Sequence, residues 1–570
     1  MKRKFGLAMI IALAGFLAVS CSSLKKMKKH AGDITYAVTP EVLAAKGGAV
    51  DVKIDVTFPG QYFNKNTRVE ATPVLRFNGG EKPFEMKALQ GEKVAGNMEV
   101  IPYNEGKTIT YTGRVPYEDA MRLSNLEIDL VGFKGAKSLA FGPRKIGNGV
   151  IATAALVENK PRPSLGADGF QRVTKKQKEA AIYYQINSAE IRGRQTTSNE
   201  IKELEAFIKE ATLPGNATLG SIDVKSYASP DGPLGLNEKL ADNRENGATA
   251  FLKNRLKTKK ILTPTASLFN QQVVPEDWEG FQEAMEHSSI QDKELILRVL
   301  SMYPDPETRE REIKNIASVF PAVAGQVLPK LRRSLFVVNV EQTGKADEEL
   351  KALARANPGE LNAEELLHAA TLFEGQGDKL SIYRVATRLY PTDWRGFNNA
   401  GTILLERGEI VEAKANFERA ASLSPGNKTV QNNLGAVALK EGDIRQASVY
   451  LDNATGAGAG VDYNKGILAI INGDYNAAVR HLENYNDVNA ALANVLAGNY
   501  NEAAKKLNAE NSAPGFYLKA VIGARMNNAA MVLENLKKAT TLKLSCKRLA
   551  ATDVEFARYF DDPGFAAIVK

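Results

Sequence analysis

Apolar and polar residues alternate along the first third of the chain, and this alternation predicts β-strands. Every second residue is apolar from Val50 to Phe58 and again from Leu126 to Leu130. Breaks rich in asparagine and glycine, among them Asn78-Gly79-Gly80, separate such runs and favour turns. We therefore expect residues 31–160 to form an all-β domain.

Short strands and turns at this spacing are typical of an Ig-like sandwich, which is the architecture that we expect for residues 31–160. The sequence offers no ligand-binding constellation there, so we expect the domain to act as a spacer or to contact a partner. Pro161, Pro163 and Gly166 follow in close succession, and they predict a short linker at 159–169.

The middle of the chain mixes strand and helix patterns. The predicted elements are strands at 182–186, 222–224 and 335–340, and a helix that begins near Thr197. This order predicts an α+β domain at 172–345, in which helices pack on a mixed sheet. Helical spacing within 271–328 indicates an insertion ahead of the last strand.

The stretch from Ser226 to Arg244 combines a strand end, a turn and the start of a helix. It reads S-Y-A-S-P-D-G-P-L-G-L-N-E-K-L-A-D-N-R, with Pro230-Asp231-Gly232 as the turn and Asn237 as the expected helix cap. The pattern resembles the OmpA-like peptidoglycan-binding domain of envelope proteins in diderm bacteria. The resemblance places Asn237 and Leu240 on family positions, and it implies that Arg244 grips diaminopimelate in the wall peptide.

The same family carries a carboxylate on the strand-end loop, and Ser229 stands at that position here. A zwitterionic ligand needs an anion for its ammonium group as well as a cation for its carboxylate, whereas serine offers a neutral hydrogen bond. Asp231 substitutes for the missing carboxylate if the turn swings it inward. A second interpretation stays open, in which Arg244 pairs with Asp242 or Glu245 on a solvated helix face.

A period of 34 residues organises the last third of the chain. The repeated positions are Gly401, Ala413, Phe417 and Ala420, followed by Gly435, Ala447, Leu451 and Ala454. Turn glycines recur at Gly408, Gly442, Gly473 and Gly498. Small residues where two helices approach, with a large apolar residue on the second helix, resemble tetratricopeptide repeats (TPRs).

The TPR resemblance implies paired helices over 346–545, stacked into an all-α solenoid whose concave groove binds peptides or proteins. We expect residues 546–570 to cap this array, because a terminal repeat otherwise leaves an apolar side exposed to water. The alternative is that this tail fills the groove.

The first thirty residues have the features of a bacterial lipoprotein signal. A basic start precedes an apolar run, and small residues lead to Cys21. This resembles a lipobox, which implies a signal peptide at 1–20, lipidation of Cys21 and a basic tether at 21–30. An uncleaved anchor and an ordinary secretory signal remain alternatives. Ser22, where aspartate would favour the inner membrane, and the basic residues after it point to the periplasmic face of the outer membrane.

Charge and candidate chemistry exclude several classes of function. The net charge is +8, and seven of these charges come from the first thirty residues, so the rest of the chain is close to neutral. It therefore lacks the excess of positive charge that indicates nucleic-acid binding. The four histidines show no metal-ligand spacing, and no phosphate-binding loop or nucleophile elbow is present. Cys546 has no intrachain partner once Cys21 is acylated. We expect no enzyme activity, no metal and no cofactor.

Two functions remain. The first is an outer-membrane lipoprotein that acts as a tether and scaffold, with its OmpA-like domain on peptidoglycan and its TPR groove on envelope proteins. The alternative is an accessory scaffold subunit of an outer-membrane protein complex or assembly machinery, without peptidoglycan binding.

Overall fold

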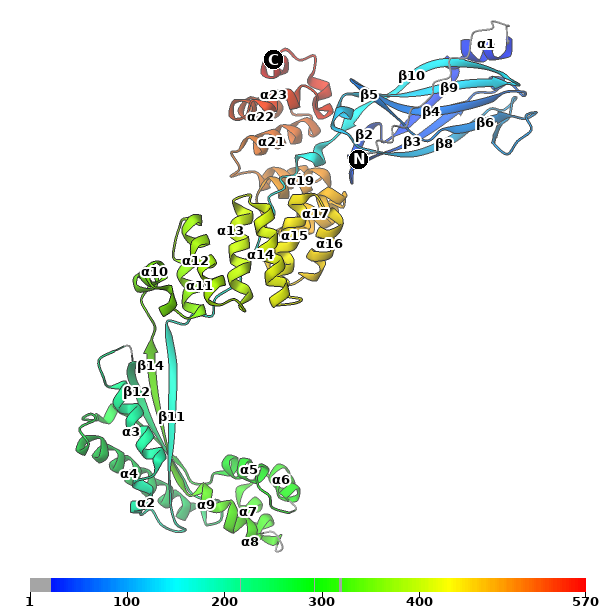
Figure 1. Ribbon diagram of the computed structural model, residues 1–570. Coiled ribbons are helices and arrows are strands. Elements are labelled where there is room, and N and C mark those ends of the chain that lie inside the picture. The colour runs from blue at the N-terminus through cyan, green and yellow to red at the C-terminus, as the bar shows by residue number, and fades with distance from the viewer. Residues whose placement is uncertain (1–21, 216, 292, 317–319) are drawn as a thin grey trace, which may run out of the picture. The chain divides into compact units, whose positions relative to one another are not determined.

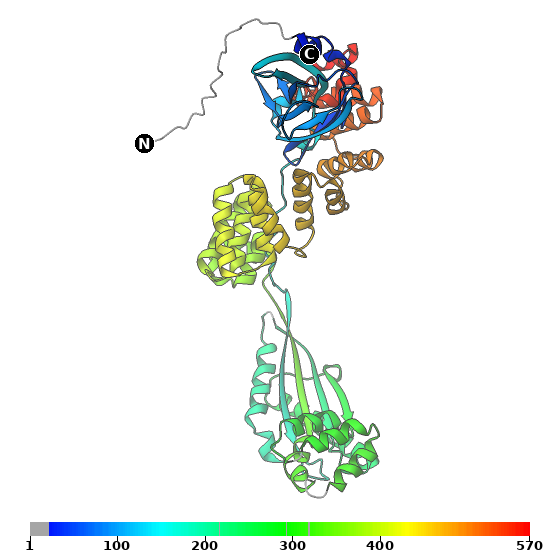
Figure 2. The same cartoon turned by 90° about the vertical axis from the view of Figure 1, so that its right-hand side faces the viewer.

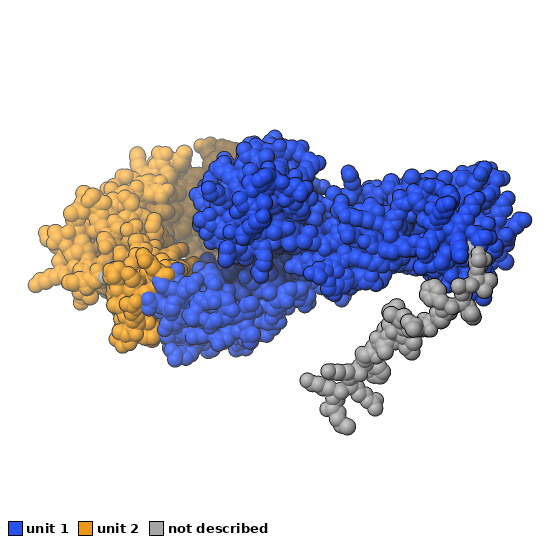
Figure 3. Space-filling model, turned by 90° about the horizontal axis from the view of Figure 1, so that it is seen from above, with its two compact units in different colours: residues 1–167, 375–570 blue, residues 168–374 orange. Residues whose placement is uncertain are grey.

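The computed structural model describes residues 22–215, 217–291, 293–316 and 320–570. The expected signal peptide and the expected lipidation site, Cys21, lie outside these residues. The chain divides into two compact units, residues 1–167 with 375–570 and residues 168–374 (Figure 3). Within the described ranges, no helix is both long and apolar enough to cross a bilayer.

The first unit begins with a region built from ten strands (Figure 1). They are β1 (Thr35–Thr39), β2 (Val42–Lys46), β3 (Ala49–Phe58), β4 (Arg68–Phe77), β5 (Gly80–Pro83), β6 (Lys87–Gly91), β7 (Glu99–Ile101), β8 (Lys107–Pro116), β9 (Ser124–Lys134) and β10 (Lys137–Ile151). Their order is β1-β3-β2-β10-β9-β4-β6-β7, with β8 paired to β3 and β5 paired to β4.

The alternating residues of these strands fill one core. Val52 and Ile54 of β3 join Ile128 and Leu130 of β9 in a single buried cluster, because alternate side chains of a strand point to the same face. β2 pairs with strands on both sides of this core, antiparallel to β3 and parallel to β10. The prediction of a sheet-rich N-terminal region is confirmed, while its assignment as an Ig-like sandwich stays a prediction.

The basic segment after Cys21, which we expected to act as a tether, has a defined structure. It forms helix α1 (Ser22–Lys29), whose Leu24 and Met27 are 1% and 2% exposed. The Tyr62 hydroxyl donates a hydrogen bond to the Met27 carbonyl over 3.1 Å. Two apolar residues three positions apart share one helix face, so this face packs on the strands while the lysines stay in water.

The second unit contains a four-stranded sheet in the order β11-β14-β12-β13 (Figure 2). Its strands are β11 (Val173–Tyr183), β12 (Ala217–Tyr227), β13 (Phe269–Val274) and β14 (Arg333–Thr343). Only the β12–β13 pair is parallel. Helices α2 (Gly193–Thr196), α3 (Asn199–Ala211) and α4 (Leu234–Thr258) accompany the sheet, and apolar residues of α3 and α4 share its core.

Two boundaries in this unit differ from the expected ones. β11 begins at Val173, well before the strand expected at 182–186, because its polar residues pair with β14 although they show no apolar alternation. The insertion expected at 271–328 overlaps β13, so its helical part starts later. Its helices are α5 (Trp278–Glu286), α6 (Lys293–Met302), α7 (Pro306–Asn315), α8 (Phe320–Gln326) and α9 (Leu328–Leu331), which gather at one end of the strands (Figures 1 and 2).

The remainder of the chain is helical, which confirms the prediction of a TPR-like C-terminal region. The second unit ends with α10 (Asp347–Ala356) and α11 (Ala363–Thr371). In the first unit the helices are α12 (Gln376–Leu389), α13 (Trp394–Glu406), α14 (Ile410–Leu423), α15 (Lys428–Glu441), α16 (Ile444–Asn453), α17 (Ala459–Asn472), α18 (Tyr475–His481), α19 (Val488–Leu496), α20 (Tyr500–Lys506), α21 (Ala513–Arg525), α22 (Ala529–Leu542), α23 (Ser545–Ala550) and α24 (Pro563–Val569).

The repeated small and large residues form the contact inside each hairpin. A Cβ atom added to Gly401 of α13 would lie 2.8 Å from the Phe417 ring of α14, and one added to Gly435 would lie 2.7 Å from Leu451. Phe417 and Leu451 are fully buried. The turn glycine Gly442 has a φ of +77°, in the left-handed region that favours glycine. The helices can therefore approach closely only because glycine stands at these positions.

Residues 546–570 cover the last hairpin, as a terminal cap does. Phe556 and Phe565 are buried, and the Phe556 ring lies edge-on to Tyr517 of α21 with centroids 5.7 Å apart. Cys546 is buried at the start of this segment, and burial raises the pKa of its thiol. The alternative position of the tail, inside the groove, is taken by a different segment that is described below.

Candidate functional site

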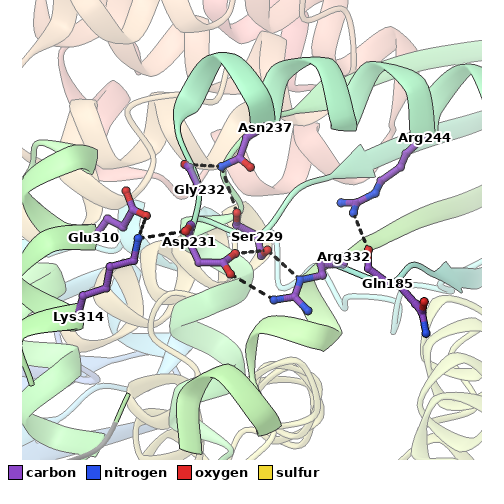
Figure 4. Close-up of polar contacts among 9 residues, drawn as sticks. All are labelled: Gln185, Ser229, Asp231, Gly232, Asn237, Arg244, Glu310, Lys314 and Arg332. Atoms are coloured by element: carbon purple, nitrogen blue, oxygen red, sulfur yellow. Dashed lines mark hydrogen bonds and ion pairs between the residues drawn. The ribbon is translucent and has the colours of Figure 1, made fainter. Parts of the chain in front are cut away.

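The stretch from Ser226 to Arg244 forms one wall of a cleft at the end of β12. β12 ends at Tyr227, the turn at Pro230–Gly232 follows, and α4 starts at Leu234. Arg332, which immediately precedes β14, lies opposite this turn (Figure 4). The cleft has a volume of about 210 Å³, and its charged lining residues are Asp231, Arg244 and Arg332.

Arg244 is buried and is held by the backbone of its own domain. Its guanidinium group donates to the carbonyl oxygens of Ser188 over 2.9 Å, Tyr227 over 2.8 Å and Gln185 over 3.3 Å. Its side chain is 1% exposed, and burial lowers the pKa of the guanidinium to about 10. Its bonded partners in the described chain are these carbonyls, so the interpretation of a surface pair with Asp242 or Glu245 is wrong.

Asp231 does turn toward the cleft, and Ser229 lies beside it. The Ser229 hydroxyl donates to the Asp231 carboxylate, and Arg332 donates to both residues, over 3.0 Å to Ser229 Oγ and 3.3 Å to Asp231 Oδ2 (Figure 4). The side chains of Arg332 and Asp231 are 9% and 18% exposed. One carboxylate and two guanidinium groups therefore meet in this cleft.

Asn237 has a different role from the helix cap that we expected. Its amide group donates to the carbonyl oxygens of Ser229 over 3.1 Å and Gly232 over 2.9 Å. α4 begins at Leu234 with Pro233 as its N-cap, so Asn237 lies inside the helix and not before it. Asn237 therefore fixes the turn that presents Asp231.

The helical insertion supports the same turn from the other side. Lys314 of α7 donates to the Asp231 carbonyl oxygen over 3.0 Å (Figure 4). Arg333 pairs with the buried Asp277 at the start of α5 over 2.9 Å. The sequence did not predict that Arg332 faces Ser229 and Asp231. The only signal for this contact in the sequence is the pair Arg332-Arg333 at the start of the last strand.

A second candidate site lies on the repeat array, where residues 158–166 cross α13, α15, α17 and α19 without forming a helix or a strand. Asparagines of these helices hold the segment, and we call the four that bond both backbone groups of one residue, one from each helix, the asparagine ladder. Asn398 and Asn432 donate further bonds to the same segment. The pairs of the ladder are Asn399 with Gly166, Asn433 with Ser164, Asn464 with Arg162 and Asn489 with Glu158. In every pair the asparagine side chain accepts from the backbone N–H and donates to the backbone C=O of the same residue, over 2.7 to 3.0 Å.

The ladder has a sequence signal that only the structure explains. Each asparagine stands two residues before the small residue of its first helix, for example Asn399 before Gly401 and Asn433 before Gly435. Repetition of the same position in stacked hairpins lines up the side chains, and an asparagine offers both a donor and an acceptor. The linker expected at 159–169 is thus bound to the array over most of its length.

Comparison with known proteins gives only partial matches. No protein-family model matches the chain, and no curated protein matches it. Matches among solved structures include a tetratricopeptide repeat protein from Parabacteroides merdae (18% identity, 37% of this chain, 91% of that chain, TM-score 0.28). Two others are PilW, a type IV pilus biogenesis factor (14%, 40%, 100%, 0.27), and yeast Tom70 (13%, 58%, 77%, 0.25). The TPR-like fold rests on the hairpin packing described above, since scores of this size do not establish a family.

Proposed function

We propose that this protein is a scaffold lipoprotein on the periplasmic face of the outer membrane, which binds other envelope proteins and performs no catalysis. The observation that carries the proposal is the asparagine ladder, because it holds an extended polypeptide through its main chain. Acylation of Cys21 would anchor the scaffold to the membrane without spanning it. The basic residues of α1 then lie next to the lipid headgroups.

Photo-crosslinking in intact envelopes tests the scaffold. A photoreactive residue is placed at Val411 of α14 or Val449 of α16, whose side chains are 82% and 50% exposed. We expect an adduct of one discrete mass from these two positions and none from Leu213, which is 57% exposed and lies in the other unit. If the array yields no adduct at either position, the scaffold function is wrong.

We also propose that the cleft of the α+β domain contacts the amino acid end of a peptidoglycan peptide. Asp231 supplies an anion for an ammonium group, and Arg332 with Arg244 supplies cations for a carboxylate, which together fit a zwitterion. Two observations favour the alternative of an accessory subunit without wall binding. Arg244 already donates three hydrogen bonds to backbone carbonyls, and Ser229 stands at the position where the family has a carboxylate.

Co-sedimentation of the purified protein with peptidoglycan decides between these two functions. Asp231→Asn and Arg332→Met each remove one charge from the cleft, and we expect each to weaken sedimentation about tenfold, because a charge-assisted hydrogen bond contributes at least ~1.4 kcal/mol. The matched control is Arg194→Ala, which removes an exposed arginine of the same domain and should leave sedimentation unchanged. Failure of the unmodified protein to sediment would establish the alternative.

A further inference from the structure

The asparagine ladder binds a polypeptide through its backbone and leaves most of its side chains without a specific contact. Arg162, Ser164 and Gly166 are alternate residues of an extended segment, and their backbone groups on one side face Asn464, Asn433 and Asn399. Because each bidentate contact uses only the N–H and C=O groups, any extended chain offers the same partners.

Two positions of the bound segment do depend on the side chain. The guanidinium carbon of Arg162 lies 3.9 Å from the Tyr463 ring centroid and 4.6 Å from that of Tyr485, and its Nη2 lies 3.1 Å from Asp487. Aromatic faces and a carboxylate together favour a guanidinium group.

The second selective position is Gly166. A Cβ atom there would lie 2.9 Å from the Trp394 ring and 3.0 Å from the Arg395 side chain, so a larger residue does not fit without displacement. The surface therefore selects an extended segment with arginine four residues before glycine.

The contacts that hold residues 158–166 are side-chain contacts from the array, which a second polypeptide can also make. The segment forms no helix or strand, and the backbone groups that face the ladder bond to side chains of the array. The ladder asparagines are buried beneath the segment, so a competing extended segment that makes the same hydrogen bonds leaves none of their amide groups unpaired. Attachment at both ends gives the segment an effective concentration on the order of millimolar, which a competitor must overcome.

We propose that the asparagine ladder is an exchangeable peptide-binding site, in which residues 158–166 are the resident ligand and an extended segment of a partner protein, with arginine four residues before glycine, replaces them. This inference deepens the proposed scaffold function by naming the chemistry of the docked segment. It also implies that the array binds a partner only when the partner outcompetes the chain's own linker.

Fluorescence anisotropy with a labelled peptide of residues 156–168 tests the exchange. The full chain carrying Arg162→Ala and Gly166→Val has a weakened resident segment, and we expect it to bind the peptide about tenfold more tightly than the unmodified chain does. Adding Asn433→Ala and Asn464→Ala should weaken that binding about tenfold, whereas Asn501→Ala, on the exposed surface of α20, should not change it. A peptide with valine at the position of Gly166 should bind about tenfold more weakly.

A second measurement uses the unmodified chain. Hydrogen exchange of the amides in residues 158–166 should accelerate about tenfold when the unlabelled peptide is added at millimolar concentration, and the valine peptide should accelerate it much less. The exchange proposal is overturned if the weakened chain, with native helical circular dichroism, does not bind the peptide, or if binding persists without Asn433 and Asn464. It is equally overturned if the peptide leaves amide exchange unchanged. Failure here leaves the crosslinked partners at Val411 and Val449 in place, so it is distinguishable from failure of the scaffold function.

Discussion

Replacing Arg244 by alanine is expected to destabilise residues 168–374 by about 4 kcal/mol, because the carbonyl oxygens of Ser188 and Tyr227 would lose their guanidinium donor and an unsatisfied buried group costs roughly 1–3 kcal/mol. The Gln185 carbonyl would keep the N–H of Ser188 as its donor. The chain has two tryptophans, Trp278 and Trp394. In a Trp394→Phe background, fluorescence of Trp278 during urea unfolding therefore follows this unit alone.

The matched control for this variant is Arg194→Ala, which removes an exposed arginine and should change the free energy of unfolding by no more than about 0.5 kcal/mol. An Arg244→Ala chain that unfolds like the unmodified one would mean that the guanidinium group does not hold the loop to the strand end. The result also bears on wall binding, since a loss of sedimentation in Arg244→Ala would reflect an unfolded cleft. Asp231 and Arg332 are for this reason the better residues for testing the ligand.

Truncation of Phe417 to alanine should lower the free energy of unfolding of the hairpin α13–α14 by about 3–5 kcal/mol, the usual cost of deleting a fully buried aromatic ring. The cost is high here because Gly401, against which the ring packs, has no side chain that could move into the cavity. In a Trp278→Phe background, fluorescence of Trp394 on α13 reports the unfolding of this hairpin in urea.

The same helix supplies a matched control for Phe417. Val411→Ala shortens an apolar side chain that is 82% exposed, and it should change the free energy of unfolding by about 0.5 kcal/mol or less. Equal effects of the two substitutions would contradict the packing of Phe417 against Gly401 as the source of hairpin stability. Because neighbouring repeats stabilise one another, we expect the loss at Phe417 to extend into α15 and α16 as well.

Periodicity was the most informative feature of the sequence. The 34-residue recurrence of Gly401 and Phe417 predicted the paired helices, because helix packing at close range requires a small residue opposite a large one, and this requirement is local. Strict alternation near Val50 and Ile128 predicted strands, because alternate residues of a strand face the same side of the sheet, which is also a local requirement. By contrast, the polar first half of β11 has no pattern of its own and becomes a strand through pairing with β14.

The two candidate sites show where local reasoning ends. The turn that presents Asp231 could be read from Pro230 and Gly232, but the partner of Asp231 comes from Arg332, about a hundred residues further on. The prediction of Asn237 as a helix cap failed because α4 already begins at Leu234, with Pro233 at the N-cap position. The asparagine ladder is formed by residues spread over four hairpins, and its occupant precedes all of them in the chain.

The sequence by itself determined the classes of the elements, the repeat period and the residues available for chemistry, since these depend on spacing between near neighbours. The tertiary structure alone decided which distant groups meet: it brought Arg332 to Ser229, tied Arg244 to backbone carbonyls and laid residues 158–166 on the ladder. The physical reason is that hydrogen bonds and charge pairs act over a few ångströms in space, whatever the separation along the chain.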